Sequence, residues 1–587
     1  MTFRLRYLPL LLSPLAVVSC TPTKPPPPRQ SAYVDLGPKD VSEFMKGTIW
    51  EQTDLANANP ARVSGFGLVV NLDGTGDTRA PNPVRDYMVK QMQKHGFGSS
   101  VQRGFEKFGP EQVLNDKLHR TAIVRLDGFI PPGAHKGDTF DVQVSALDGN
   151  NTSSLRGGEV YDTDLAPRGA DVFNPGGGLV NPWGHVSGPI AVNPSYAVAD
   201  EISGENAKLS LRTGIVMGRG VSSMDRPLIL KLRQPERRIA RRIEARVDDK
   251  YQDSNTASAK DEGQVWITVP PSYHGDWEHF AQVVMHLYFN TSAEFAAVKA
   301  QQLADIATRD KDKAPLSDIS YCWEGLGEPA LNALRPLYTS DSPDVAYAAA
   351  RAAAFIGDVP AQDVLAHIAE TRDHPFQVNA VEALAGIRPT AHTRTILRGL
   401  LDTDQTLVRV AAYKAMLQTG DPVIISRSVR DKFILDVVES AGPPIIYASR
   451  VGTPRIAVIG RPMTLKFPTL LMAMKNSFTL VTDDSHHSAK VFYRGSMDQK
   501  DVSLEFQPDV PLLIARLGGE VPPGEPRVTF SYSDIVGIMQ KLVDDKLVEA
   551  KTDNGQQLAA IFEMQALPGL EDPVSDAPSI PEQRPTK

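Results

Sequence analysis

The sequence predicts a multidomain α+β fold with a strand-rich, mixed α/β N-terminal half, an α-helical repeat array and a small α+β C-terminal region. Three observations support this prediction. Short β-branched runs separated by glycine and proline fill residues 41–295. Residues 315–425 carry an internal helical repeat, and residues 426–567 mix strand-like and helix-like patterns.

The composition is that of a folded protein with several domains. The chain has 587 residues, of which 41% are apolar and 22% charged, so it can bury ordinary cores in about three to five domains. The net charge is -8 at pH 7. Because nucleic-acid binding calls for a strongly basic domain, we expect no nucleic-acid partner.

Residues 1–20 predict a lipoprotein signal peptide. Arg4 and Arg6 precede an apolar run over residues 8–18, which is too short to span a bilayer. The small residues before Cys20 resemble a bacterial lipobox, which implies cleavage before Cys20 and lipid on its sulfur. The alternative is a plain secretory signal with a chance cysteine. Because Thr21 is not aspartate, we expect a periplasmic protein anchored to the outer membrane rather than the inner membrane.

Two further segments and the second cysteine complete this picture. Residues 21–40 contain four consecutive prolines and predict an extended tether. Residues 568–587 are rich in Pro, Glu and Asp and predict a disordered tail. Cys322 has no disulfide partner if Cys20 is lipidated, and we expect it to be a small buried side chain.

The N-terminal half alternates between strand and helix patterns. Strands are predicted over residues 63–72, 121–126 and 139–147, and an amphipathic helix over 83–96. Residues 171–194 are rich in Gly, Pro and Asn and predict a long loop.

A basic amphipathic helix is predicted over residues 233–251. Ile239, Ile243 and Val247 share one face, and arginines cover the rest. The arginines could contact phosphate or the cell wall, but a solvated face over a packed stripe is the favoured interpretation.

Three alanine-rich segments define the repeat, which has a period of about 31–32 residues. They are residues 345–352, 376–383 and 408–415, each preceded by an acidic or proline-containing turn. The pattern resembles HEAT-type helical repeats, which usually present protein-binding surfaces. A simple helical spacer is the alternative. In the region that follows, strands are predicted over 502–506 and 528–532 and a helix over 534–547.

Two motifs resemble segments of the flagellar P-ring protein family. The first is a strand ending in a glycine-rich turn, Gly65-Phe66-Gly67-Leu68-Val69-Val70-Asn71-Leu72-Asp73-Gly74-Thr75-Gly76-Asp77, and the second is Ser153-Ser154-Leu155-Arg156-Gly157-Gly158. Weaker similarities over residues 131–138 and 235–247 occur in the same order, so the resemblance covers about residues 55–290. It implies a closed homo-oligomeric ring around the distal rod at the level of peptidoglycan, with no catalysis and no cofactor. The flagellar rod, the L-ring protein and peptidoglycan are the implied partners. The motif residues that we expect to serve assembly or structure are Gly65, Gly67, Gly74, Thr75, Gly76, Asp77, Leu155, Arg156, Gly157 and Gly158.

The chain also departs from the family. The family's C-terminal portion is not evident after Leu287, and P-ring proteins generally carry a plain export signal. A second hypothesis is therefore an envelope lipoprotein scaffold, unrelated to motility, that binds protein partners through its HEAT-like array.

No enzyme or metal motif stands out in the sequence. It contains no G-x-S-x-G elbow, P-loop or H-E-x-x-H pattern. Asp73 and Asp77 lack the spacing of a calcium loop and favour a tight turn. The histidines at 274, 279, 286, 486 and 487 have no cysteine or carboxylate residues near them at the spacing typical of metal sites, so we expect no metal site.

Overall fold

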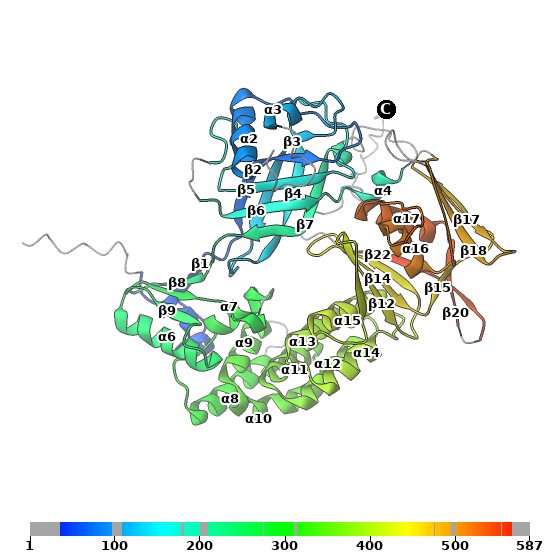
Figure 1. Ribbon diagram of the computed structural model, residues 1–587. Helices are drawn as coiled ribbons and strands as arrows, with labels where there is room; N and C mark the ends of the chain where they lie inside the picture. Colours follow the sequence, from blue (N-terminus) through cyan, green and yellow to red (C-terminus); the bar gives the residue numbers. More distant parts are fainter. Residues whose placement is uncertain are drawn as a thin grey trace, which may run out of the picture.

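The computed structural model describes residues 36–96, 109–177, 181–199, 209–273, 275–309, 314–474, 476–494, 501–552 and 554–565. The predicted signal peptide with Cys20, residues 21–35 of the predicted tether and the predicted tail lie outside these residues. Figure 1 shows a strand-rich N-terminal half, a helical array and a C-terminal region that returns to the N-terminal half. The predicted fold class is confirmed. Within the described ranges, no helix combines the length and apolar character needed to cross a bilayer.

Six strands close into a barrel in the order β2-β3-β4-β7-β6-β5. β2 closes it, because it pairs with β3 along most of its length and with β5 through Val69 and Val70. The first three strands and α2 fall where the sequence predicts strands and a helix. The bounds are β2 (Ala61–Val70), β3 (Ala122–Ile130), β4 (Thr139–Ala146), β5 (Glu159–Leu165), β6 (Gly184–Pro189) and β7 (Thr213–Ser222), with the helices α2 (Asn82–Lys94), α3 (Pro110–Val113) and α4 (Pro194–Ala197) beside them.

β2 is buried on both of its faces. Val63 and Val69 point into the barrel core, whereas Phe66, Leu68 and Val70 pack outside it with α2. α2 contributes its predicted apolar stripe, and this burial explains the nearly continuous apolar run of β2.

The prediction of a loop over residues 171–194 is wrong in part, because residues 184–189 form β6. β6 pairs with β5 and β7, and without it the barrel would not close. The glycines of β6 are typical of a loop, which explains the wrong prediction. A Cβ atom on Gly184 would lie 2.8 Å from the carbonyl oxygen of Val221 and 3.2 Å from the ring of Phe140, so glycine permits a close approach inside the sheet.

A four-stranded sheet, in the order β1-β8-β10-β9, lies between the barrel and the helical array in Figure 1. The predicted basic helix, α6, packs on it through Ala240, Ile243 and Val247, while Arg237 and Arg238 remain exposed. This favours the solvated-face interpretation for these two arginines. The elements are α1 (Ile49–Gln52), β1 (Thr53–Ala56), β8 (Leu228–Leu232), α6 (Arg237–Tyr251), β9 (Ala257–Ala259), β10 (Gln264–Ile267) and α7 (Trp277–Met285).

The helical array follows from residue 293. Its three repeat segments lie on α11, α13 and α15, where small alanines are buried and allow neighbouring helices to pack closely. Helical structure is confirmed here, whereas assignment to the HEAT type stays a prediction. Cys322 is buried in this core as expected, and burial raises the pKa of its thiol to about 12. The helices are α8 (Ala293–Arg309), α9 (Leu316–Leu326), α10 (Leu331–Leu334), α11 (Pro343–Ile356), α12 (Val359–Glu370), α13 (Gln377–Gly386), α14 (Ala391–Leu400) and α15 (Thr406–Gln418).

The C-terminal region combines three sheets with two helices around one core. The predicted strand over 502–506 and helix over 534–547 correspond to β19 and α17. The predicted strand over 528–532 is wrong: Val528 and Phe530 are buried, but this segment joins no sheet and leads directly into α17.

Most strands of this region were not predicted from the sequence. The elements are β11 (Ile425–Val429), β12 (Phe433–Glu439), β13 (Ile445–Ala448), β14 (Arg455–Gly460), β15 (Met463–Leu465), β16 (Leu470–Ala473), β17 (Phe478–Asp483), β18 (Ser488–Tyr493), β19 (Val502–Phe506), α16 (Val510–Gly518), α17 (Tyr532–Asp544), β20 (Val548–Lys551), β21 (Gln557–Ala559) and β22 (Ile561–Met564).

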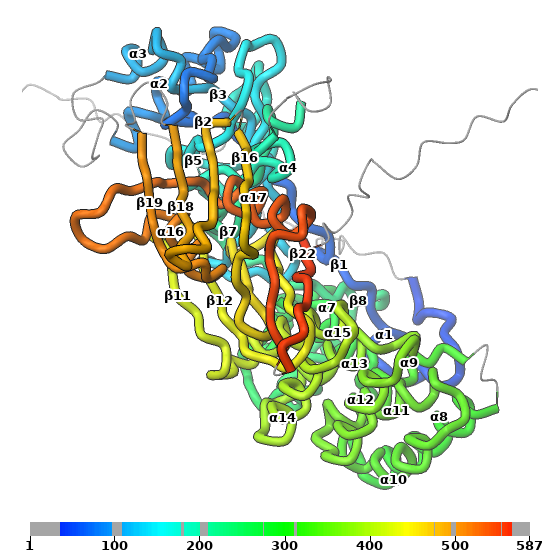
Figure 2. The backbone as a smooth tube through the Cα atoms, turned by 90° about the vertical axis from the view of Figure 1, so that its right-hand side faces the viewer, coloured from blue at the N-terminus to red at the C-terminus, as the bar shows by residue number. Residues whose placement is uncertain are grey.

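The C-terminal region packs directly against the barrel. Val198 and Met217, from the barrel side, belong to the C-terminal hydrophobic core. Figure 2 shows α17 beside α4, and the two helices are in contact. The array therefore leads the chain away from the barrel and the C-terminal region brings it back.

Candidate functional site

The two sequence motifs meet at one end of the barrel. The hydroxyl of Thr75 donates a hydrogen bond of 2.7 Å to the carbonyl oxygen of Ser154. In return, the N–H of Ser153 donates to the carbonyl oxygen of Thr75 at 2.9 Å. The glycine-rich turn after β2 and the loop before β5 therefore form one structural unit, although they are far apart in the sequence.

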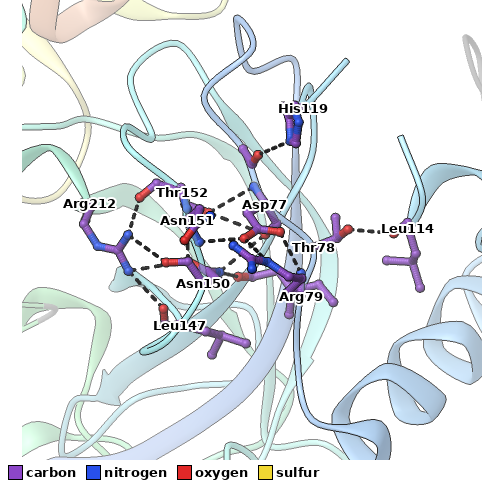
Figure 3. Close-up of polar contacts among 12 residues, drawn as sticks. Asp77, Thr78, Arg79, Leu114, His119, Leu147, Asn150, Asn151, Thr152 and Arg212 are labelled. Atoms are coloured by element: carbon purple, nitrogen blue, oxygen red, sulfur yellow. Dashed lines mark hydrogen bonds and ion pairs between the residues drawn. The ribbon is translucent and has the colours of Figure 1, made fainter. Parts of the chain in front are cut away.

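Asp77 is the polar centre of this unit, as Figure 3 shows. Only 8% of its surface is exposed. One of its carboxylate oxygens accepts from the N–H of Asn151 at 2.6 Å and from Nε of Arg79 at 2.7 Å. Burial by itself would raise the pKa of Asp77, but hydrogen bonds from Asn151 and Arg79 and the positive charge of Arg79 hold it below its usual value. This pairing fits the tight-turn interpretation of the aspartate.

Arg212 joins the unit from the segment before β7. Its guanidinium donates to the backbone carbonyls of Leu147 at 3.0 Å and Asn150 at 3.3 Å, and also to that of Thr152. These bonds hold the loop that carries Asn151 against Asp77 (Figure 3). Sequence reasoning missed Arg212, because nothing in the local sequence distinguishes it from other arginines.

The motif glycines make close backbone packing possible. A Cβ atom on Gly76 would lie 2.2 Å from the carbonyl oxygen of Thr121, and one on Gly158 would lie 2.6 Å from a methyl group of Val69. A Cβ atom on Gly65 would lie 2.6 Å from the carbonyl oxygen of Asp164, and one on Gly67 would lie 2.7 Å from a methyl group of Leu126. Gly74 and Gly157 have φ angles of +70° and +72°, which other residues rarely adopt.

Leu155 and Arg156 are adjacent but point into different environments. Leu155 is fully buried in the barrel core. Arg156 reaches across to the C-terminal region, where its Nε lies 2.7 Å from a carboxylate oxygen of Asp534. A second guanidinium nitrogen lies 3.2 Å from the sulfur of Met474. Sequence reasoning selected Arg156 but could not identify its partner, which is 378 residues away.

Further polar contacts fix the C-terminal region on the barrel. The N–H of Val192 donates to the hydroxyl of Ser533 at 2.9 Å. The carboxylate of Asp141 accepts from the N–H of Gly218 at 2.6 Å and from that of Gly452 at 2.9 Å. Burial raises the pKa of Asp141, although these two N–H groups oppose the shift.

A groove of about 1180 Å³ runs along the contact between the barrel and the C-terminal region. Its barrel side includes Thr75, Ser154 and Arg156, and its C-terminal side includes Tyr493 and Phe530. The arrangement holds two parts of one chain together. It contains no nucleophile and base in hydrogen-bond contact among the residues that line it.

The histidines considered in the sequence are dispersed. His279 and His286 are buried, whereas His486 and His487 are exposed, and His274 lies outside the described residues. In the described part of the chain, no group of three or more His, Cys, Asp or Glu side chains is arranged to bind a metal.

Comparison with known proteins matches residues 49–301 to the family described as "Flagellar P-ring protein". The chain is 30% identical over 229 residues to the flagellar P-ring protein of Burkholderia mallei, covering 37% of this chain and 55% of that protein. It is 26% identical over 226 residues to the protein of the same name from Geotalea uraniireducens, covering 38% and 55%. A third relative of that name, from a Bradyrhizobium species, is 29% identical over 257 residues, covering 42% and 61%. The chain thus spans a little over half the length of these curated relatives.

Proposed function

We propose that this chain, whose residues 49–301 match the flagellar P-ring family, is a structural component of the flagellar basal body. The family match carries the proposal, because it includes the whole barrel and the four-stranded sheet, not one isolated motif. The role is structural and includes no enzymatic step.

The proposal extends to assembly and location. Copies of the chain would form a ring around the distal rod in the periplasm, with the L-ring protein and peptidoglycan as neighbours. Lipid on Cys20 would anchor each copy to the outer membrane through the proline-rich tether of residues 21–40. A closed ring of identical subunits needs a heterologous interface, and a rigid subunit makes its closure angle reproducible.

The proposed domains follow the chain order. Residues 41–295 form the P-ring-like domain, 315–425 the HEAT-like array and 426–567 the C-terminal domain. The unit around Asp77 stabilises one end of the barrel, and Arg156 fixes the C-terminal domain to it. In this proposal the motif residues serve assembly indirectly, by setting the shape of the subunit.

The test is the mass of residues 21–587, measured by size-exclusion chromatography with light scattering, followed by electron microscopy of any large particle. This protein lacks the lipidated cysteine but retains every described residue. Large annular particles would support the ring proposal. A strict monomer over a wide concentration range, both alone and with purified rod, would contradict it.

The array supports a second candidate function. Its stacked helices, α8 to α15, form an extended surface of the kind that repeat proteins use to bind partners. An envelope scaffold of this type would be a monomer that binds a partner through the array. Flagellar rod or L-ring genes beside the gene for this chain would favour the first function over the second.

A further inference from the structure

A cavity of about 490 Å³ opens where the P-ring-like domain meets the helical array. α7, α9, α11 and α13 line it, so residues far apart in the sequence share one wall. Figure 1 shows α9 and α13 on the side of the array that faces the barrel. The volume lies within the range of about 300–1,000 Å³ that is usual for ligand sites.

Aromatic rings form the apolar part of the wall. The rings of Tyr347 and Phe376 are stacked, with centroids 4.6 Å apart and planes at 3°. Tyr321 and Phe355 also line the cavity, and their ring centroids lie 4.4 Å and 5.2 Å from the Arg351 guanidinium. Aromatic faces of this kind attract cations.

The positive groups of the cavity already have partners. Arg351 lies 3.5 Å from a carboxylate oxygen of Glu324 and donates to the hydroxyl of Ser320 at 3.3 Å. His279 lies between the carboxylates of Glu324, at 2.8 Å, and Asp276, at 3.5 Å. These contacts leave Arg351 and His279 little capacity to neutralise other carboxylates.

Three carboxylates at the cavity lack such partners. Among the described residues, Glu278, Asp344 and Glu382 form no hydrogen bond or ion pair through their side chains. Partial burial raises the pKa of Glu382; Lys414 opposes this shift and Asp276 adds to it. The net excess of negative charge beside aromatic rings is complementary to a cation that also has an apolar stem.

We propose that this cavity binds an arginine or lysine side chain of a partner protein, with its cation beside Glu382 and its stem against Tyr347 and Phe376. A protein source fits better than a free cation, because the cavity lies on a stacked helical array, whose surfaces typically bind proteins. Asp341 and Asp373, in the turns before α11 and α13, extend the negative charge beyond the cavity. This inference is independent of ring assembly.

The test is saturation-transfer NMR with residues 21–587 and three probes. The probes are capped arginine, capped citrulline as its neutral isostere, and a capped Arg-Ala-Arg-Ala-Arg peptide. We expect saturable binding of arginine, about tenfold weaker binding of citrulline, and peptide binding at least about tenfold tighter than that of arginine.

Variants locate the site. Glu382→Gln should weaken binding of the peptide about tenfold, and Glu382→Lys should weaken it further. Glu370→Gln, an exposed glutamate on α12 that does not line the cavity, is the matched control and should bind normally. Thermal unfolding of each variant checks that the fold is intact.

Three results would overturn the proposal. Equal binding of citrulline and arginine would exclude recognition of the charge. Unchanged binding by folded Glu382→Gln would place the ligand elsewhere. A peptide no tighter than capped arginine would indicate a small free cation instead of a protein segment.

Discussion

Arg156→Gln should loosen the C-terminal region from the barrel. Asp534, the partner of Arg156, is only 5% exposed, and the substitution removes its charged partner at 2.7 Å. Asp534 still accepts hydrogen bonds from the N–H of Ser531 at 3.0 Å and from its hydroxyl at 2.8 Å, so it does not lose all its partners. A hydrogen bond between charged groups contributes about 1.5–3 kcal/mol, and the 33% exposure of the Arg156 side chain lowers this figure. We therefore expect a loss of about 1–2 kcal/mol in the free energy that holds the two parts together.

Hydrogen exchange measured by mass spectrometry is the suitable assay, because a chain with several domains does not unfold in two states. Amides of α17 and α4 should exchange about 5- to 30-fold faster in the variant, whereas those of β3 should not change. Arg120→Gln is the matched control: this arginine also lines the groove, but it pairs with Asp116 only four residues away. Exchange in α17 that stays within about twofold of the parent rate, or an equal effect of the control, would refute the reasoning.

Three further predictions concern the barrel. Gly76→Ala should lower the thermal unfolding temperature, because the new Cβ atom would lie 2.2 Å from a backbone oxygen, at a cost of about 1–3 kcal/mol. Gly109→Ala is the control and should have little effect, because there is open space around Gly109. Leu155→Ala should destabilise the barrel by about 2–5 kcal/mol, because Leu155 is buried in its core. Leu118→Ala is the control: this side chain is 61% exposed, so its loss should change the stability by less than about 0.5 kcal/mol. A change this small for Leu155→Ala would contradict the place of Leu155 in the core. Asp77→Asn tests a pH dependence. Folding lowers the pKa of Asp77 below its ordinary value of 3.8, so its stabilisation is fully present above that value and is lost as pH falls through the lower, folded-state pKa. The difference in unfolding temperature between parent and variant should therefore shrink between pH 6 and pH 3, and a constant difference would argue against the charge.

The observed packing gives the array a structural role in addition to any binding role. It packs at one end with the segment around Phe44 and Tyr288, and at the other with strands of the C-terminal sheet, including Val438 and Ile459. The array thus links two parts that also contact each other through Arg156. The C-terminal region is therefore connected to the barrel in two ways, through the array and by direct contact.

Local patterns in the sequence determined much of the fold. The apolar periods of α2, β4, α6 and α17 are visible in single segments, because one buried face is enough to impose them. The three alanine-rich repeat segments likewise predicted α11, α13 and α15, since small residues are needed wherever stacked helices pack closely. The two glycine motifs also indicated the flagellar P-ring family, and the family model matches residues 49–301.

Only the tertiary structure decided how distant segments combine. The sequence predicts a loop where β6 forms, because the glycines of β6 serve contacts with strands that the local sequence does not identify. Residues 528–532 alternate like a strand, yet they join no sheet. Phe530 is buried by ring contacts with Phe478 and Tyr493, and such side-chain burial does not need backbone pairing with a strand. Three-dimensional proximity also decides the polar contacts. Arg156 pairs with Asp534, and Asp77 accepts hydrogen bonds from Asn151 and Arg79. The sequence determined which residues are buried or tightly turned, since these are local free-energy preferences, whereas the partners of polar side chains were decided by the folded arrangement of the chain.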